Sequence, residues 1–447
     1  MNTSILRFKP KTRWMAALAI LPTAHLLFLA ANQSGILVEP TTDNLAVGLV
    51  DEMKFETLEQ ISQAGLQKAK LAQQPWSDSY WPIYKGSLAV RFNDPEFPDS
   101  IDWKENVDFL AGRIGQGPVE NLSPAEKYDL LVGDTSFSLT RRMLEEGRPY
   151  YERSKEVEPW MGYCHGWAPA SFMEKRPRHK VDVLSYDGSQ VIPFVPSDIK
   201  ALATLLWAKG QSKTTRFIGR RCNTASPPRD RLGRALQQEC LDTNAGTWHL
   251  SVVNQIGGAG RTFVMDATRD FEVWNHPVLG YSYSYFNPVT GKDTASLAEA
   301  KIARTAFSSD PRKGFRAQGS THVVGIKMDV TYLVETFPSD RVLDSEKYDA
   351  SRTIGYRYEL ELDSDGRIIG GEWLSEVQPD FLWTESKRSV PKTLGDQTLD
   401  SQWDRATWNA GNQEKIPSTW KAAAIQSSRV GQPLRRIVRS LIESSNL

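Results

Sequence analysis

Three residues of types that cooperate in nucleophilic catalysis occur in the order Cys164, His249 and Asp266. A thiolate is a strong nucleophile, and a neighbouring imidazole can take the thiol proton. A carboxylate on the far ring nitrogen fixes the orientation of the imidazole. We therefore predict that Cys164 is the nucleophile, His249 the acid/base and Asp266 the orienting group of a site that forms thioesters with carbonyl substrates.

The nucleophile requires a helix that begins near Cys164. Gly162 and Gly166 flank the cysteine, and Pro169 is tolerated only within the first turn or so of a helix. The free amides and the dipole at the start of such a helix favour a thiolate.

The imidazole and the carboxylate are expected on a strand–turn–strand unit. Residues 248–255 and 262–268 have strand composition and are separated by the glycine-rich turn 257–260. A two-residue or a four-residue loop leaves His249 and Asp266 on the same face of the hairpin, within side-chain reach of each other.

Each of these residues also has a purely structural interpretation. A single cysteine is often a small buried hydrophobic residue, and Asp266 could merely end its strand. Other histidines that could serve as the base are His179, His276 and His322, with His276 expected in a loop because Pro277 follows it. An aromatic substrate cleft is expected to use Trp160, Trp167 and Trp248.

The remaining cysteines, Cys222 and Cys240, enclose a polar loop rich in proline and arginine. A disulfide there would remove about 3 kcal/mol of loop entropy from the unfolded chain and would need an oxidising compartment. The basic, then apolar segment 1–31 is typical of a signal peptide, with an uncleaved membrane anchor as the alternative. We expect a secreted or periplasmic protein, which contacts a membrane only if this segment is retained.

The composition favours a globular protein with no affinity for nucleic acid, because 54 basic residues balance 54 acidic ones. The expected divisions are a signal peptide or N-terminal anchor (1–31), a helical and extended arm (32–120), a catalytic core (121–305), a β-rich extension (306–390) and a polar C-terminal tail (391–447). Ser123 and Glu126 form a capping box that predicts a helix from Pro124. Residues 323–328 and 356–362 alternate as strands do, and 433–442 predicts a short basic amphipathic helix.

Several stretches resemble the transglutaminase elicitor family, which was first described as plant-defence elicitors and also occurs in bacteria. The similar segments are 122–129, 164–170, 198–202, 266–270, 273–275 and 370–373. The resemblance spans about residues 121–383, in the expected order, and implies an α+β fold with a papain-like transglutaminase core. In such a core the helix that bears Cys164 packs on an antiparallel sheet that bears His249 and Asp266, with an additional β-rich C-terminal part.

This resemblance implies an acyltransferase whose thiolate attacks the carboxamide of a protein glutamine and transfers the acyl group to a primary amine. The implied partners are a protein or peptide glutamine donor and a primary-amine acceptor. A glutamine deamidase or a cysteine peptidase would use the same three residues, and a non-catalytic elicitor or binding module is the alternative from another class.

No cofactor is expected, although Glu361, Asp363, Asp365, Gly366 and Glu372 occupy the positions of a calcium-binding loop. The first position should be aspartate and the flanks are strand-like, so a hairpin turn explains these residues better. No His, Cys and carboxylate cluster has zinc spacing.

Overall fold

The structure, a computed structural model, describes residues 45–447 except 212–213, 238–239 and 242. These residues belong to one compact unit, 40–447. The predicted signal segment, 1–31, lies outside the described residues. Among the helices that the structure describes, none is long and apolar enough to cross a membrane.

Ten of the described strands form one antiparallel sheet, in the order β11-β10-β9-β6-β5-β12-β4, with β1 and β7 paired to β6 and β8 to β9. Its strands are β1 (Lys68–Lys70), β4 (Thr215–Gly219), β5 (Val264–Met265), β6 (His276–Phe286), β7 (Asp293–Thr294), β8 (Lys301–Ala303), β9 (His322–Val334), β10 (Ala350–Leu362), β11 (Ile368–Trp373) and β12 (Phe381–Glu385). Strands β2 (Val181–Leu184) and β3 (Val191–Phe194) form a separate hairpin. The predicted strands at 323–328 and 356–362 are confirmed within β9 and β10.

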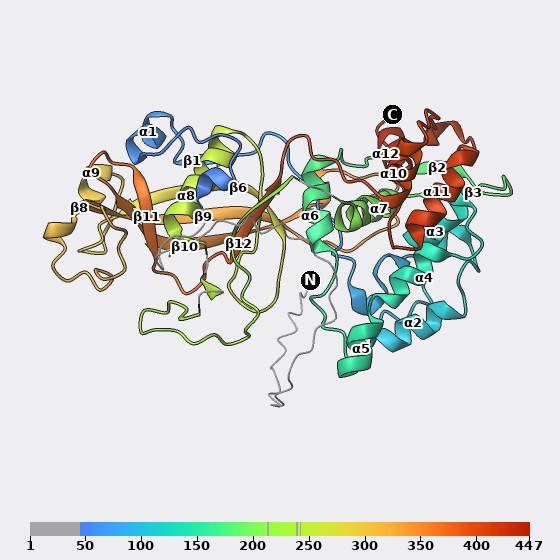
Figure 1. The fold of residues 1–447 in the computed structure, drawn as a ribbon, viewed down its shortest axis with the longest axis horizontal. Coiled ribbons are helices and arrows are strands. Elements are labelled where there is room, and N and C mark those ends of the chain that lie inside the picture. Colours follow the sequence, from blue (N-terminus) through green and yellow to red (C-terminus); the bar gives the residue numbers. More distant parts are fainter. Residues whose placement is uncertain (1–44, 212–213, 238–239, 242) are drawn as a thin grey trace. The chain divides into compact units, whose positions relative to one another are not determined.

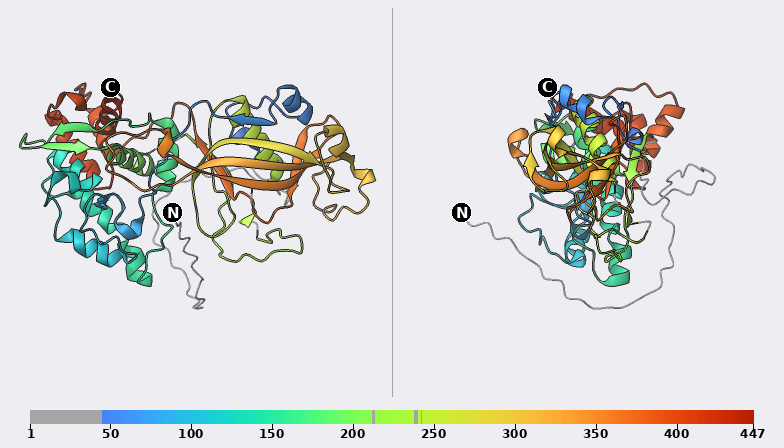
Figure 2. Two further views of the ribbon diagram at one scale, coloured as in Figure 1. Left: turned by 180° about the vertical axis from the view of Figure 1, so that it is seen from behind. Right: turned by 90° about the vertical axis from the view of Figure 1, so that its left-hand side faces the viewer.

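The α-helices of the described residues surround a central helix, α6 (Cys164–Met173). Figure 1 shows the sheet on one side of α6 and most of the helices on the other, and Figure 2 gives the same arrangement from behind. The remaining helices are α1 (Leu58–Gln63), α2 (Trp103–Ala111), α3 (Pro124–Val132), α4 (Ser138–Glu145), α5 (Arg148–Ser154), α7 (Pro196–Lys209), α8 (Ala245–Val252), α9 (Leu297–Ala300), α10 (Leu394–Ser401), α11 (Ser418–Ser428) and α12 (Arg435–Ser444).

Two large hydrophobic cores lie on either side of α6. The helical core includes Cys164 and Trp167 of α6 itself, and the sheet core is built mainly by β6, β9, β10 and α8. A smaller cluster joins Ala168 of α6 to Val264 of β5 and Trp383 of β12. The helix that bears Cys164 therefore packs against an antiparallel sheet, and the predicted α+β class is confirmed.

The capping box at the start of α3 is formed as predicted. The Ser123 hydroxyl accepts a hydrogen bond from the Glu126 amide, and Pro124 occupies the first helical position. Side chains of α3 also connect this helix to its neighbours. Lys127 pairs with Asp198 of α7, and the Asp129 carboxylate accepts hydrogen bonds from the backbone amides of Leu139 and Thr140 at the start of α4.

The strand expected at 248–255 is wrong. Residues 245–252 form helix α8, and 253–258 continue as a π-helical segment. Helix α8 is buried on nearly all sides, and Gly246 lets it approach β11 closely, since a Cβ there would lie 2.6 Å from the carbonyl carbon of Gly370. Because a helix buried on nearly all sides need not be amphipathic, α8 lacks the helical period, and Trp248, Leu250 and Val252 alternate with polar residues as in a strand.

The N-terminal arm contains less helix than expected. Residues 64–70 end in strand β1, which pairs with β6. Residues 76–97 form an irregular segment with short 3₁₀ turns, and Trp76 and Trp81 are 1% exposed in the helical core. This segment therefore packs along the helical core as an extended arm.

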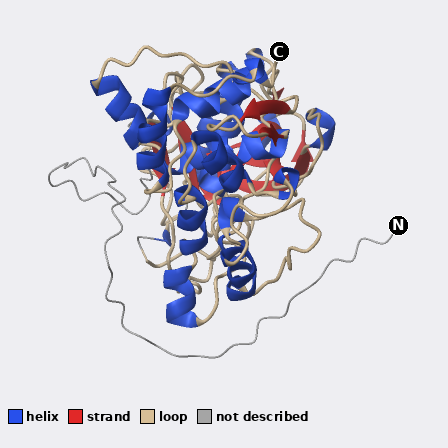
Figure 3. Ribbon diagram, turned by 90° about the vertical axis from the view of Figure 1, so that its right-hand side faces the viewer, coloured by secondary structure: helices blue, strands red, loops and turns tan. Residues whose placement is uncertain are grey.

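The segment expected as a polar tail, 391–447, carries α10, α11 and α12. Figure 3, which is seen from the side of the helices, shows helices in front of the strands of the sheet. Leu399, Trp420, Ile437 and Leu441 of this segment are buried in the helical core. The amphipathic helix predicted near the end of the chain is confirmed as α12, and its apolar face accounts for this packing.

The predicted disulfide and the predicted hairpin turn are both present. Cys222 and Cys240 form a disulfide. The calcium-like residues form a β10–β11 hairpin in which Gly366 has a positive φ of 81°. The Glu361 carboxylate accepts hydrogen bonds from Arg316 and Ala317, and Glu372 pairs with Arg234. The described residues contain no group of three or more His, Cys, Asp or Glu side chains that could hold a metal ion.

Candidate functional site

Cys164 is the first residue of α6, and two glycines allow the helix to sit where it does. At Gly166 a Cβ would lie 2.3 Å from the carbonyl oxygen of Thr204 in α7. At Gly162 it would lie 2.4 Å from the carbonyl oxygen of Tyr80. Side chains at these positions would push α6 away from α7 and away from the arm, so the glycines on both sides of the cysteine are required by close packing.

The sulfur of Cys164 is buried against the residues that precede β6. Cys164 is 4% exposed. Its Sγ donates to the carbonyl oxygen of Val273 over 3.8 Å and accepts from Nδ2 of Asn275 over 3.4 Å. The indole Nε1 of Trp383 donates to Oδ1 of Asn275 over 2.8 Å, which turns the amide nitrogen toward the sulfur.

Burial raises the pKa of the Cys164 thiol to about 11, although hydrogen bonds from Asn275 act in the opposite direction. The charges of Glu335 and Asp266 raise this pKa further. The thiol is therefore protonated near neutral pH in this structure. The thiolate that the helix start was expected to favour is not formed, because desolvation outweighs the amides and the dipole.

Asp266 follows strand β5 directly and is fully buried. Its amide donates to Phe381 of β12, and its carboxylate accepts from the amide of Trp274 over 3.4 Å. Burial raises the pKa of Asp266 well above its usual range, and the nearby charge of Asp380 adds to this effect. Asp266 thus holds the same segment, 273–275, that contacts the sulfur of Cys164.

His249 lies on α8 and not on a strand that faces Asp266. Its Nδ1 is 2.8 Å from the hydroxyl of Tyr358, and its ring packs edge-on against Tyr283. Burial alone lowers the pKa of His249 to about 3, so no carboxylate acts on this ring. Within the described residues no hydrogen bond, ion pair or ring contact joins His249 to Cys164 or Asp266. The structure brings together the cysteine and the aspartate, but not the histidine predicted from the sequence.

His276, in contrast, lies beside this cluster. It is the first residue of β6, directly after Asn275, and its ring is parallel to that of Trp274. Its Nδ1 lies 3.7 Å from Oε1 of Glu335, which follows β9. Burial lowers the pKa of His276 to about 4 and raises the pKa of Glu335 to about 7.

Tyr80 of the irregular segment 76–97 closes the site. Its carbonyl oxygen accepts from the amide of Tyr163, the residue before the cysteine, over 2.6 Å. Its hydroxyl donates to Pro159, and its ring meets Trp274 edge-on at 5.2 Å. Tyr80 and Trp274 therefore pack together next to the residues that flank the buried Cys164.

Two of the three tryptophans expected in the cleft are buried in the hydrophobic cores. Trp167 and Trp248 are 0% exposed, and Trp167 donates its indole hydrogen to the carbonyl oxygen of Trp76. Trp160 is half-buried and packs edge-on against Phe271. Sequence reasoning missed Tyr80, Asn275 and Glu335, and it set His276 aside because of Pro277. Asn275 and His276 could have been found from the sequence, because the family-like stretch 273–275 ends at Asn275 and His276 follows it directly.

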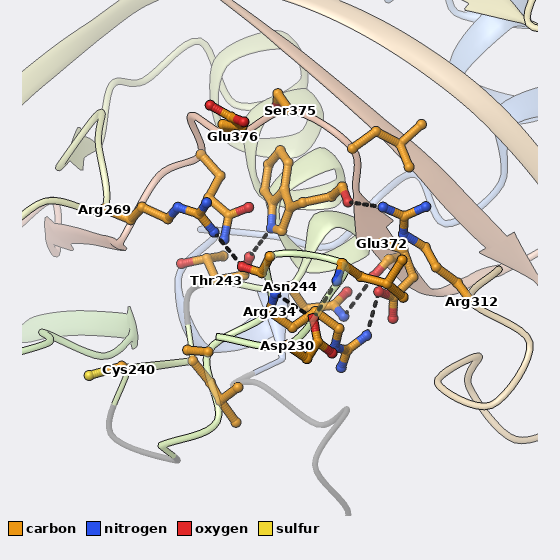
Figure 4. Close-up of a pocket in the computed structure, with 18 of the residues that line it drawn as sticks. Asp230, Arg234, Cys240, Thr243, Asn244, Arg269, Arg312, Glu372, Ser375 and Glu376 are labelled. Carbon is orange, nitrogen blue, oxygen red and sulfur yellow. Dashed lines mark hydrogen bonds and ion pairs between the residues drawn. The ribbon is translucent and has the colours of Figure 1, made fainter. Parts of the chain in front are cut away.

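A polar cavity of about 540 Å³ beside the disulfide is separate from this site, since Cys164 does not line it. Figure 4 shows Arg234 beside Glu372 and Arg312 nearby. Three of the four arginines of its lining bind the chain itself. Arg234 pairs with Glu372, Arg269 donates to Gly233, and Arg312 donates to Trp373.

Comparisons with known proteins bear on the family and the fold of the chain. The family model described as transglutaminase elicitor matches residues 151–401, a range that includes Cys164, Asp266 and His276. Among solved structures, the crystal structure of the GP42 transglutaminase from Phytophthora sojae matches with a TM-score of 0.51 and 18% sequence identity, over 85% of this chain and 94% of that one. At this identity the likeness shows the fold.

A search of curated proteins found no significant sequence match. The family model nevertheless covers more than half of the 447 residues. The protein therefore belongs to the transglutaminase elicitor family.

Proposed function

We propose that the protein is a transglutaminase-type acyltransferase in which Cys164 attacks the carboxamide of a protein glutamine. One observation carries the proposal: a free cysteine begins a buried helix, Asp266, Asn275 and Glu335 act on its thiol, and His276 follows Asn275 directly and faces Glu335. Membership of the family and the fold shared with a transglutaminase support this reaction class.

His276 is the proposed acid/base, in place of His249. Its ring belongs to the cluster around Cys164, whereas His249 contacts Tyr283 and Tyr358. Glu335 faces Nδ1 of His276 and would orient the ring and stabilise its protonated form. The thiol and the imidazole make no hydrogen bond here, and catalytic hydrogen bonds commonly tighten only when the substrate is bound.

In the first half-reaction the thiol proton passes to His276 as sulfur attacks the carboxamide carbon. The carbon–nitrogen bond then breaks, and ammonia leaves with the proton that the imidazole returns. The side-chain amide of Asn275, which Trp383 holds toward the sulfur, is placed to donate to the developing oxyanion, together with the backbone amides at the start of α6. In the second half-reaction a primary amine attacks the thioester and releases the thiol.

An oxidising compartment is part of the proposal. The disulfide between Cys222 and Cys240 is typical of secreted and periplasmic proteins, and the basic and apolar segment 1–31 has the pattern of a secretory signal. We infer that the protein acts outside the cytoplasm.

The test is to incubate the purified protein with a glutamine-containing peptide and a labelled primary amine, beside a Cys164→Ala variant. Incorporation of the label that depends on Cys164 supports a transferase. Release of ammonia without incorporation would instead indicate a deamidase, and cleavage of the peptide backbone a peptidase. A folded protein without any of these activities would leave the elicitor or binding module as the function.

A further inference from the structure

A cavity of about 350 Å³ opens between the segment 76–97 and the residues that follow β9. Aromatic side chains dominate its lining: Tyr80, Tyr84, Phe92, Phe97 and Phe337. Phe337 is 88% exposed, so it lies where the cavity meets solvent. Glu335 lines the same cavity with a side chain that is 17% exposed, and we refer to this space as the Glu335 cavity.

The charged residues of this lining are all described, and only Glu335 lacks a cationic partner in contact with it. Lys85 pairs with Asp99, and Arg91 binds Asp94 and Glu126. Oε1 of Glu335 is buried and accepts no hydrogen bond in the described part of the chain. Its neighbour His276 is neutral near neutral pH, because burial lowers the pKa of that ring to about 4.

Tyr80 connects the Glu335 cavity to the residues around the thiol. Tyr80 forms part of its wall, and the same residue accepts a hydrogen bond from Tyr163 and packs against Trp274 beside Cys164. The carboxylate of Glu335 is near enough to Cys164 to raise the pKa of the thiol. A group bound against Glu335 would therefore need only the movement of Tyr80 to reach an acyl group on the sulfur.

We propose that the Glu335 cavity binds the acyl acceptor, a primary alkylammonium such as a lysine side chain, with Glu335 paired to the ammonium group. The inference rests on the acyltransferase function proposed above. Aromatic walls suit the methylene stem of such a side chain and attract its cationic end. An unpaired carboxylate at the inner end selects a cation over a neutral or anionic acceptor.

Glu335 also removes a proton from the bound ammonium group in the second half-reaction. An alkylammonium must lose a proton before its nitrogen can attack, and the carboxylate of Glu335 is the group in contact that can take it. The nitrogen then bonds to the acyl carbon, the carbon–sulfur bond breaks, and the electron pair stays on the sulfur of Cys164. The second proton of the amine passes through His276 to the sulfur, and Glu335 releases the first proton to solvent. The products are an amide, the thiol and one proton.

The experiment measures the fraction of the thioester that reacts with an added amine and not with water. The full chain is supplied with one glutamine peptide and either n-pentylamine, a long cation, or hydroxylamine, which is small and mostly neutral near pH 7. Incorporation is expressed per ammonia released, so that any change in thioester formation cancels. The variants are Glu335→Gln, the conservative Glu335→Asp, and Thr336→Trp, which fills the cavity from its lining.

We expect the pentylamine ratio to fall about tenfold or more in Glu335→Gln and Thr336→Trp, with partial recovery in Glu335→Asp. The hydroxylamine ratio should change little in Thr336→Trp, and in Glu335→Gln it should fall less than the pentylamine ratio, because the contact of Glu335 with His276 serves both acceptors. Equal losses for both acceptors, or no loss in either variant, would overturn the cavity's role. A wild-type protein that releases no ammonia in a Cys164-dependent manner would refute the proposed function itself, so the two failures are distinguishable.

Discussion

The side-chain amide of Asn275 donates a hydrogen bond to the sulfur of Cys164 over 3.4 Å, and Trp383 fixes the direction of that amide. A donor aimed at a nucleophilic sulfur stabilises both the thiolate and an oxyanion that forms beside it. This relationship makes Asn275 the residue whose loss should affect the chemistry most clearly without removing the thiol.

Replacement of Asn275 by alanine is expected to slow ammonia release from a glutamine peptide by about 10²–10³, the usual effect of removing one oxyanion donor. Trp383→Phe removes only the indole donor that orients the amide, so a smaller loss is expected. Rates are compared at equal concentrations of folded protein. Asn275→Ala with wild-type turnover would exclude a donor role.

The titration of the thiol provides a second prediction. Burial raises the pKa of Cys164 to about 11, so only about 10⁻⁴ of the thiol is ionised near pH 7. Alkylation by iodoacetamide is expected to be very slow near pH 6 and to rise with pH up to about 11, whereas in urea the same thiol should titrate near about 8.5. Rapid alkylation of the folded protein near pH 6 would contradict the closed, protonated site.

The parts of the fold that depend on local chemistry could be predicted from the sequence. The helix after Ser123 follows from a capping box, the turn at Asp363 from its Asp-Ser-Asp-Gly residues, and the disulfide from two cysteines around a polar loop. Each of these features is determined within about twenty residues of chain, where turn and cap preferences act directly.

The partner of Cys164 could not be predicted in this way. In residues 248–252 the apolar Trp248, Leu250 and Val252 alternate with His249 and Ser251, which is the period of a strand, yet these residues form a helix that is buried on nearly all sides. His276 was judged a loop residue because of Pro277, yet proline is tolerated near the start of a strand, where β6 begins. Glu335 directly follows β9, far along the chain, and only the folded sheet brings it to the site.

The two histidines are separated by a direct comparison. His276→Gln is expected to lower the rate of thioester formation by about 10²–10⁴, the range for a general acid/base. His249→Gln should change this rate little, because the ring of His249 contacts Tyr358 and Tyr283. Urea unfolding of both variants controls for lost stability. A loss of activity confined to a folded His249 variant would restore the triad expected from the sequence.

The buried ion pair between Lys127 and Asp198 joins α3 to α7 over 2.7 Å, with side chains that are 1% and 0% exposed. Lys127→Met leaves the carboxylate buried without its partner and is expected to lower the free energy of unfolding by about 3–5 kcal/mol. The double variant Lys127→Met/Asp198→Asn should recover part of this loss, although the cap that Asp198 provides to Val195 is weakened. A single-variant loss below about 1 kcal/mol, measured by urea unfolding, would show that the pair contributes little.

The contact between α6 and α7 provides the last prediction. A Cβ at Gly166 would lie 2.3 Å from the carbonyl oxygen of Thr204 and 2.6 Å from the Cβ of Ala208, so Gly166→Ala must push the two helices apart. We expect a loss of about 1–3 kcal/mol in the free energy of unfolding and slower thioester formation, because Cys164 moves with its helix. The matched control is Gly314→Ala, where a Cβ would meet no atom within 4 Å, and its effect should stay within about 0.5 kcal/mol. Equal stability of the two variants would mean that α6 can shift without cost, and the position of Cys164 would then not depend on this contact.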